Sequence, residues 1–406
     1  MKFQHRQLDN GLTIIGEVNP DAQSAAVGFF VRTGSRDETA DVSGVSHFLE
    51  HMLFKGTETL SALEVNEAFD RLGAKFNAFT GEENTVYYAA VLPEYLDAVA
   101  NLWTQLLRPT LRQDDFEMEK NVILEEIAMY LDQPDFLVFE RGRELFFKDH
   151  PCGNSVLGSI ESITGLTAEQ MRGYFQKRYA PNNIVAACCG NFDFDRLCRE
   201  VQQQCGCWPS EQAPRLRPPY LGKSQKVYEQ KTGLNRQHLA LYSPSVSMQD
   251  NRWYAAKLLS VILGDSSGSR YFWSLVDPAI ADTACMDLAS MDAVGGFCSY
   301  ICCGPENAAQ VEDILNRLFS TLSTKGIEES ELTAARNKVL SSVAIKNERP
   351  MSRLVSLGFN WVYRREYFSV AQDIEQIRAV TVADIHGILK EFNPGDYTLY
   401  SLGPAH

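Results

Sequence analysis

The sequence predicts an α+β protein made of two homologous α/β-sandwich domains, each an antiparallel-rich sheet flanked by helices. Three observations favour this fold class. The length of 406 residues exceeds what one hydrophobic core usually supports. A hydrophobic content of 45% is ample for packed cores. Paired strand-like segments followed by helical segments occur on both sides of a proline-rich stretch, which indicates a duplicated unit.

Strand and helix signals alternate along the first half of the chain. Apolar segments near the Asn10-Gly11 turn predict a hairpin whose strands cover 12–15 and 25–31. A polar loop over 33–38 leads from this hairpin to an apolar helix over 44–54. Periodicity and two capping boxes predict further helices over 61–72, 93–107, 114–130, 135–147 and from Thr167, and strands over 75–80, 85–91 and 183–189.

A proline-rich segment divides the chain. Four prolines among charged residues mark 209–222 as a linker, so we expect an N-terminal domain over 1–208 and a C-terminal domain over 223–406. The second half repeats the outline of the first. We expect strands over 237–242, 283–289, 295–303 and 397–402, and helices over 252–263, after the 264–268 loop, and over 305–322, 329–346, 350–363 and 381–391.

The composition excludes several protein classes. A formal net charge of -14 argues against nucleic-acid binding, which needs a basic surface, and is compatible with basic peptide partners. The chain contains no run of about 18 apolar residues, and its N-terminus resembles neither a signal nor a transit peptide. We therefore expect a cytoplasmic protein without a membrane span, with its ten cysteines reduced.

The helix over 44–54 carries a metal-binding pattern. His47 and His51 lie four positions apart, so both imidazoles can reach one ion. Glu50 lies between them and can act on a metal-bound water without ligating. H-x-x-E-H is a zinc-peptidase motif, although an ordinary packed helix with two capped imidazoles is the alternative. Catalytic zinc takes three protein ligands, so a third must lie elsewhere.

A carboxylate on the helix over 114–130 is the natural third ligand. Glu119 and Glu126 are seven positions apart and share a face that borders an apolar side. Two carboxylates beside a zinc would have different roles: one would bind the metal, and the other would accept a hydrogen bond from a ligand histidine. A solvent-exposed acidic stripe is the alternative, and the spacing alone does not decide between them.

Several motifs together make the chain resemble the inverzincin family of pitrilysin, insulin-degrading enzyme and mitochondrial processing peptidase. The resemblance is strongest to the bacterial processing-peptidase-like branch and covers essentially the whole chain. It rests on GVSHFLEHMLFKGT over 44–57, NAFT over 77–80 with Glu83, Thr85, Tyr87 and Tyr88, VILEE over 122–126, the region of Gly158 with ITG over 163–165, and the loop from Leu263 to Arg270.

The resemblance implies a zinc metalloendopeptidase whose two domains form half of a clamshell. Zinc would be held by His47, His51 and Glu126, with Glu125 as the neighbouring alternative to Glu126. Glu119 would support a ligand histidine. Glu50 would take a proton from the zinc-bound water and return it to the leaving amine.

The resemblance also implies how a peptide is held. A short or unfolded peptide would add as a strand along the edge that carries Asn77, Ala78, Phe79 and Thr80, where an inward-facing hydrophobic strand is the alternative. The family usually has, in its second half, an arginine and, seven residues later, a tyrosine that contact the substrate carbonyl. Alignment places Asp277 and Ala284 at those positions, and no arginine lies between Trp273 and Cys303. We therefore expect a homologous subunit to supply the pair in a heterodimer, or else a homodimer.

Two other functions fit the same resemblance. One is a non-catalytic structural or scaffold subunit of the same fold, although such subunits typically lose the metal motif that is intact here. The other is a peptide-binding or chaperone-like chamber in which cleavage is incidental. Bound zinc distinguishes the peptidase from the scaffold, and single-turnover kinetics distinguishes it from the chamber.

Overall fold

The computed structural model describes residues 1–220 and 222–405 and divides into two compact units. Leu221, inside the predicted linker, and His406 lie outside the described residues. The first unit contains Met1–Ala128, Asn154–Leu216 and Lys346–Phe368, and the second contains Met129–Gly153, Arg217–Ile345 and Ser369–His406. The units are interleaved along the chain, and the predicted linker over 209–222 contains one of the crossings between them.

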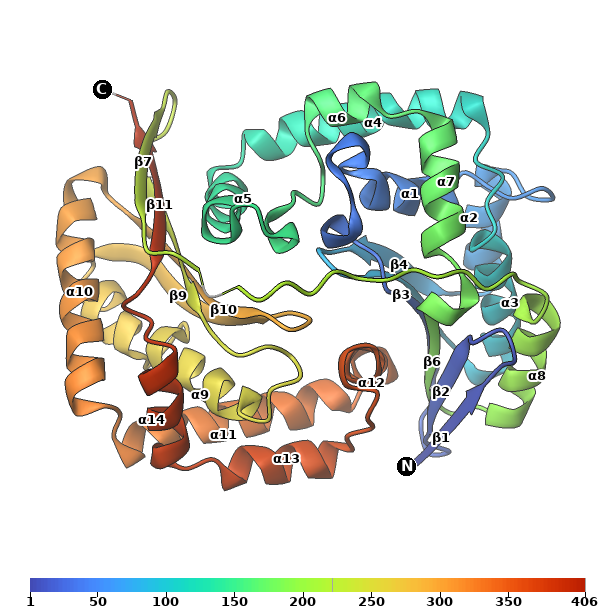
Figure 1. Ribbon diagram of the computed structural model, residues 1–406. Helices are drawn as coiled ribbons and strands as arrows, with labels where there is room; N and C mark the ends of the chain where they lie inside the picture. Colours follow the sequence, from blue (N-terminus) through green and yellow to red (C-terminus); the bar gives the residue numbers. More distant parts are fainter. Residues whose placement is uncertain (221, 406) are drawn as a thin grey trace. The chain divides into compact units, whose positions relative to one another are not determined.

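A six-stranded sheet is the framework of the first unit (Figure 1). Its strand order is β1-β2-β6-β3-β5-β4, in which β2 and β6 are parallel and every other pair is antiparallel. The strands are β1 (Lys2–Gln7), β2 (Thr13–Val18), β3 (Ala25–Val31), β4 (Lys75–Thr80), β5 (Thr85–Val91) and β6 (Ile184–Gly190). β4 is an edge strand, so one side of its backbone has no partner in this sheet.

The hairpin predicted from the Asn10-Gly11 turn was wrong in its partner strand. The turn joins β1 to β2, with Gly11 at φ 89°, and β6 lies between β2 and β3. Every residue of β6 is buried. A strand that is apolar on both faces is stable only in the interior of a sheet, which is why β6 separates two strands that are close in sequence.

Helices cover both faces of this sheet. α3 and α8 pack on one face and α12 packs on the other, while α1 lies against β4 and β5 (Figure 1). The helices of the first unit are α1 (Val45–Leu53), α2 (Ala62–Arg71), α3 (Leu96–Leu106), α4 (Gln113–Leu131), α6 (Ile160–Gly165), α7 (Ala168–Arg178), α8 (Phe194–Cys205) and α12 (Pro350–Arg364). The last residues of α4, from Met129, belong to the second unit. Short helices of the first unit are η1 (Ser35–Asp37), η2 (Ala40–Val42), η3 (Pro93–Tyr95) and η5 (Pro181–Asn183). The capping boxes predicted at Ser61 and Thr167 are confirmed at the starts of α2 and α7.

The second unit repeats the pairing pattern of the first. Its sheet has the order β7-β11-β8-β10-β9, with a parallel pair β7 and β11 followed by three antiparallel pairs. This is the order β2-β6-β3-β5-β4 over again, so the predicted pair of similar α/β domains is confirmed. The strands are β7 (Lys226–Lys231), β8 (Gln237–Pro244), β9 (Ala281–Ser290), β10 (Gly295–Cys303) and β11 (Thr398–Pro404).

The second unit is also flanked by helices. α9 packs on β9 and against α13 and α14, and α5 packs on β8 and β11. The helices are α5 (Pro134–Phe147), α9 (Trp253–Gly264), α10 (Ala308–Lys325), α11 (Glu329–Asn347), α13 (Val370–Ala379) and α14 (Val382–Glu391), with η4 (Pro151–Gly153), η7 (Pro305–Asn307) and the π-helix η6 (Phe272–Val276). Sequence periodicity missed β1, β7, α6, α8 and α13.

Each sheet receives one covering helix from the other half of the sequence. α12 follows β10 in the chain but packs on β3 and β6, and α5 follows β5 but packs on β8 and β11. Both helices contain a glycine where they approach the sheet. A Cβ atom at Gly358 would lie 2.1 Å from the ring of Phe30, and one at Gly142 would lie 2.8 Å from the ring of Tyr242. The absence of a side chain therefore allows the close contact that buries these faces.

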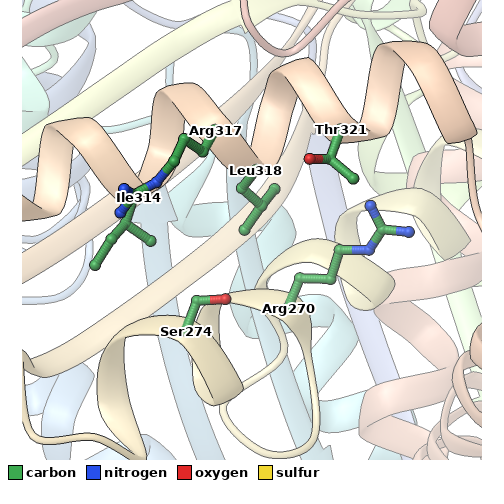
Figure 2. Close-up of a pocket in the computed structure, with 6 residues that line it drawn as sticks. All are labelled: Arg270, Ser274, Ile314, Arg317, Leu318 and Thr321. Atoms are coloured by element: carbon green, nitrogen blue, oxygen red, sulfur yellow. The ribbon is translucent and has the colours of Figure 1, made fainter.

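A pocket of about 460 Å³ lies between η6 and α10 in the second unit (Figure 2). Its lining combines cationic and hydroxyl groups with apolar side chains. The guanidinium of Arg270 is bonded to both carboxylate oxygens of Glu331, at 2.7 and 2.8 Å, and to the carbonyl of Gly326. None of the site residues predicted from the sequence lines this pocket.

Two other expectations concern the whole chain. Within 1–220 and 222–405, no helix is long and apolar enough to cross a membrane. All ten cysteines are unpaired, and burial raises the pKa of several of them, for example that of Cys189. Nine of the ten are buried or half-buried, and Cys207 is exposed in the turn after α8.

Candidate metal centre

The helix α1 brings the two predicted histidine ligands together. Its apolar residues are buried, with Phe48 stacked on Phe116 of α4 at 4.8 Å between ring centroids. This contact fixes α1 against α4. The imidazoles of His47 and His51 lie one turn apart with ring centroids separated by 4.7 Å. Both predicted side chains therefore lie on the side of α1 that faces Glu126.

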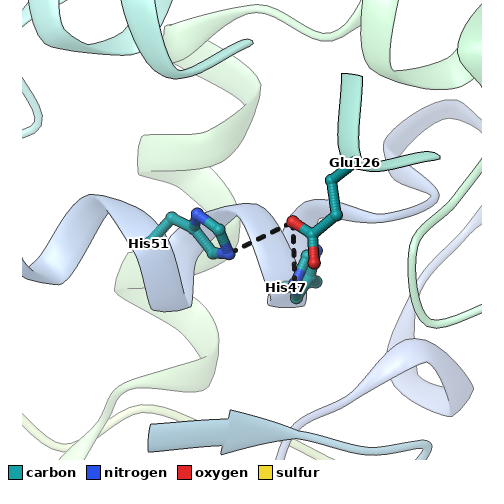
Figure 3. A group of neighbouring side chains, drawn as sticks. All are labelled: His47, His51 and Glu126. Atoms are coloured by element: carbon teal, nitrogen blue, oxygen red, sulfur yellow. Dashed lines mark ion pairs between the residues drawn. The ribbon is translucent and has the colours of Figure 1, made fainter. Parts of the chain in front are cut away.

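Glu126 of α4 completes a group of three ligand atoms (Figure 3). Its Oε2 atom lies 3.8 Å from Nε2 of His47 and 3.6 Å from Nε2 of His51. All three ligand atoms lie within 4.8 Å of one another, and no other group of this kind occurs in the described ranges. Glu125, the alternative to Glu126, is exposed and is not part of the group.

The surroundings of these three side chains fit a cation with nitrogen and oxygen ligands. Burial, with the nearby His51, lowers the pKa of His47 to about 3, so its imidazole is neutral and has a lone pair to donate. The carboxylates of Glu119 and Glu126 lie beside the histidines, and the amine of Lys55 pairs with Glu119. Two imidazoles and one carboxylate are the ligand set of many catalytic zinc sites.

Glu119 lies beside His51, in the position that the resemblance implied for it. Its Oε1 atom is 2.9 Å from Nδ1 of His51, and its other oxygen pairs with Lys55. These two contacts hold the pKa of Glu119 below its usual value although burial opposes them. A carboxylate at Nδ1 leaves Nε2 of His51 free for a metal and fixes the ring orientation.

Lys55 is a neighbour of the candidate site that the sequence interpretation did not single out. It follows His51 by four positions, as His51 follows His47, so the three residues continue one helical stripe just beyond the last residue of α1. That spacing was the available signal. The amine of Lys55 pairs with Glu119, a nearly buried carboxylate whose charge also acts on Glu126.

Glu50 lies on the same helix and is held by the sheet. Its Oε2 atom accepts a hydrogen bond of 2.6 Å from the hydroxyl of Thr80 on β4. Burial raises the pKa of Glu50, with the Thr80 hydrogen bond acting in the opposite direction. A carboxylate with a raised pKa is a stronger base than one in water, which suits a group that must accept a proton near neutral pH.

The predicted peptide-binding residues lie on the edge strand β4. Asn77 and Phe79 are exposed, whereas Ala78 is buried. The side chain of Thr80 instead donates a hydrogen bond to Glu50, which links β4 to α1. Because β4 pairs only with β5 in the sheet, its outer backbone groups are placed to bond an added strand.

The segment predicted as a polar loop over 33–38 is buried. Arg36 donates to Glu83 at 2.6 Å, in the turn between β4 and β5. Asp37 accepts from Arg178 of α7 at 2.9 Å and from Arg215 at 2.7 Å. The segment is the polar loop that was predicted, with η1 inside it, and its burial depends on charged partners that sequence periodicity does not show.

The positions aligned with the family's arginine and tyrosine lie in the second unit. Asp277 directly follows η6, and Ala284 is a buried residue of β9. Neither side chain can serve as the hydrogen-bond donor that the arginine or the tyrosine provides.

Two family models match successive parts of the chain. The model described as Insulinase (Peptidase family M16) matches residues 13–160, which include α1 and α4. The model described as Peptidase M16 inactive domain matches residues 165–339. The first half, which carries the group of His47, His51 and Glu126, is thus the half that corresponds to the peptidase domain.

Relatives and solved structures agree with this match. The chain is 30% identical to the uncharacterized zinc protease YmxG of Bacillus subtilis over 98% of this chain and 97% of the relative. It is 32% identical to an uncharacterized zinc protease of Mycobacterium tuberculosis over 98% and 92%. Its fold matches a protease from Helicobacter pylori with a TM-score of 0.92 at 20% identity, covering 99% of both chains. This chain therefore belongs to peptidase family M16.

Proposed function

We propose that this protein is a zinc-dependent endopeptidase of the processing-peptidase-like kind, which hydrolyses short or unfolded peptides. The convergence of His47, His51 and Glu126 on one point, with Glu50 on the same helix, carries the proposal. The zinc protease names of the full-length relatives support it. The cytoplasm is the location we expect from the sequence.

The chemistry follows from the positions of the side chains. Zinc, when bound, lowers the pKa of a coordinated water to about 7 and polarises a carbonyl. Glu50 is the base that removes a proton from the attacking water and returns it to the leaving amine. Thr80 fixes one oxygen of Glu50, which leaves the other oxygen for the water. Glu119 keeps Nε2 of His51 available by holding Nδ1.

The peptide adds to the free edge of β4. Main-chain hydrogen bonds along Lys75–Thr80 would align its scissile bond with Glu50, because Thr80 at the end of the strand contacts that carboxylate. Recognition of this kind requires an extended backbone. Unfolded segments and short peptides therefore fit the edge, and folded proteins do not.

The third ligand is tested by comparing two adjacent glutamates. We expect Glu126→Gln to lose zinc from the purified protein, because a neutral amide is a poor replacement for a carboxylate ligand. Glu125→Gln is the matched control, since its side chain is exposed on the same helix, and it should keep one zinc per chain. Elemental analysis after gel filtration measures both. Stoichiometric zinc in Glu126→Gln would contradict the assignment, and a wild-type protein without metal would favour a scaffold.

A homologous subunit completes the site in this proposal. The second unit has Asp277 and Ala284 where the family has its arginine and tyrosine, and Trp273 to Cys303 contains no arginine. The substrate carbonyl therefore lacks two donors in this chain. Other members of the resembled family divide the two halves of the site between subunits, which supports a heterodimer over a homodimer.

We expect the purified chain alone to cleave peptides weakly or not at all. Co-purification from the native source, followed by mass measurement, identifies the partner, and adding that partner should raise kcat/KM by at least about 100-fold, the order expected for lost transition-state contacts. The Glu50→Gln variant, assayed in the same way, gives the background rate of peptide cleavage. Full turnover by the isolated wild-type chain would contradict the need for a partner.

A further inference from the structure

The metal-binding helix α1 lacks a cap of its own. Its N-cap residue is Gly44, in the left-handed conformation at φ 90°, which has no side chain to accept a hydrogen bond. No acidic residue lies in the first turn of the helix. A helix of 9 residues gains little from cooperativity, so its unpaired N-terminal amides need partners from elsewhere.

Glu38 supplies those partners from outside the helix. Its two carboxylate oxygens accept hydrogen bonds from the backbone amides of Gly44 and Ser46, each at 2.7 Å. Only 7% of its surface is exposed. Burial raises the pKa of Glu38 to about 7, and the two backbone hydrogen bonds act against that rise. The carboxylate is thus a helix cap placed six and eight residues before the amides that it binds.

A second chain of hydrogen bonds fixes the same turn. The hydroxyl of Ser46 lies 2.8 Å from that of Tyr174 on α7, which lies 2.8 Å from the hydroxyl of Thr33. The position of Gly44 is equally tight, because a Cβ atom there would lie 2.6 Å from the carbonyl of Leu157. The first turn of α1 is therefore held by Glu38, which directly follows η1, by Tyr174 of α7 and by the backbone near Gly158.

The first turn of α1 determines whether two histidines can bind one ion. His47 directly follows Ser46, and its spacing from His51 places both Nε2 atoms toward Glu126 only while the helix is wound. If the first turn unwinds, His47 leaves the group, and of the two histidines only His51 remains beside Glu126. We infer that Glu38 is a positioning residue for the metal site, which keeps α1 wound at His47 and so sets the zinc affinity.

The test compares two buried carboxylates in the same unit. Glu38→Gln keeps the shape of the side chain but directs an amide N–H group at a backbone N–H. Glu17→Gln is the matched control, because Glu17 is also nearly fully buried and bonds to Arg353 and Tyr367, away from α1. Zinc dissociation constants are measured by competition with a fluorescent chelator, and the stability of each variant by urea unfolding.

We expect Glu38→Gln to raise the zinc Kd by about tenfold, the order of a lost helix cap, and Glu17→Gln to leave it within about twofold. A destabilised variant with a normal Kd is the signature of a structural residue. The metal-free Glu38→Gln protein should also exchange the backbone amides of α1 faster than the metal-free wild type. Glu38→Asp, which keeps the charge, should weaken zinc binding less and remains measurable if the glutamine variant does not fold.

The inference rests on the proposed metal site, and the two can fail separately. If the wild-type chain binds no zinc, the proposed function fails, while amide exchange in α1 still reports on the cap. If the wild type binds zinc and a folded Glu38 variant binds it with an unchanged Kd, Glu38 is not a positioning residue and only the inference is overturned.

Discussion

Replacing Glu50 by glutamine is expected to reduce kcat/KM for peptide hydrolysis by about 10² to 10⁴-fold while the protein keeps its zinc. The amide of glutamine matches the carboxylate in size, so the hydrogen bond from Thr80 can persist. It cannot accept a proton from water near neutral pH. The loss therefore falls on kcat, and KM should change little because the peptide binds along β4.

The comparison is made in the complete enzyme, with its partner subunit if one is required. Glu125→Gln provides the control for a neutralised carboxylate near the site, because Glu125 is exposed and outside the ligand group. It should retain nearly all activity and zinc. Turnover by Glu50→Gln at the rate of the control would remove Glu50 from the role of base, and loss of zinc in Glu50→Gln would assign it to metal binding.

Replacing Arg215 by alanine is expected to destabilise the first unit by about 3–5 kcal/mol. Its side chain is 4% exposed and donates to both carboxylate oxygens of Asp37, at 3.0 and 2.7 Å. It also donates to the backbone carbonyl of Glu83. Removing the guanidinium takes buried hydrogen bonds from Asp37 and from the carbonyl of Glu83, to which Arg178 and Arg36 remain as the charged partners. This loss of buried hydrogen bonds, together with the space left by the side chain, is the source of the large effect.

Urea unfolding, monitored by the fluorescence of the buried Trp103, measures this loss within the same unit. Arg71→Ala is the matched control, since Arg71 forms an exposed pair with Glu67 on α2 at 3.5 Å, with side chains 67% and 51% exposed. That pair should contribute less than about 0.5 kcal/mol. Equal stabilities of the two variants would show that Arg215 is not an anchor and that residues 209–216 act as a free linker.

The candidate site was largely readable from the sequence because its main element is local. His47, Glu50 and His51 lie within one helix, so their relative positions follow from helical geometry alone. The choice between Glu119 and Glu126 did not follow from spacing. It depended on a resemblance, and the structure places Glu126 at both Nε2 atoms and Glu119 at Nδ1 of His51.

The order of the strands in the sheet could not be predicted from local sequence patterns. The Asn10-Gly11 turn signals a hairpin, but no local pattern states that β6, from more than 150 residues later, separates β2 from β3. The same holds for α12, whose apolar face packs on the first sheet although it lies far along the second half. Sequence periodicity shows that a face is buried, and only the assembled sheet shows which surface buries it.

The sequence by itself determined the repeated strand and helix pattern, the helix that carries the H-x-x-E-H pattern and the acidic helix that faces it, because each depends on contacts within a turn or two. The tertiary structure decided the roles of Arg36, Asp37 and Glu38, which the sequence placed in a polar loop. These three side chains bind the turn after β4, the segment before Arg217 and the start of α1. A charged side chain is buried at low cost only where partners from distant segments bond to it, and only folding brings those segments together.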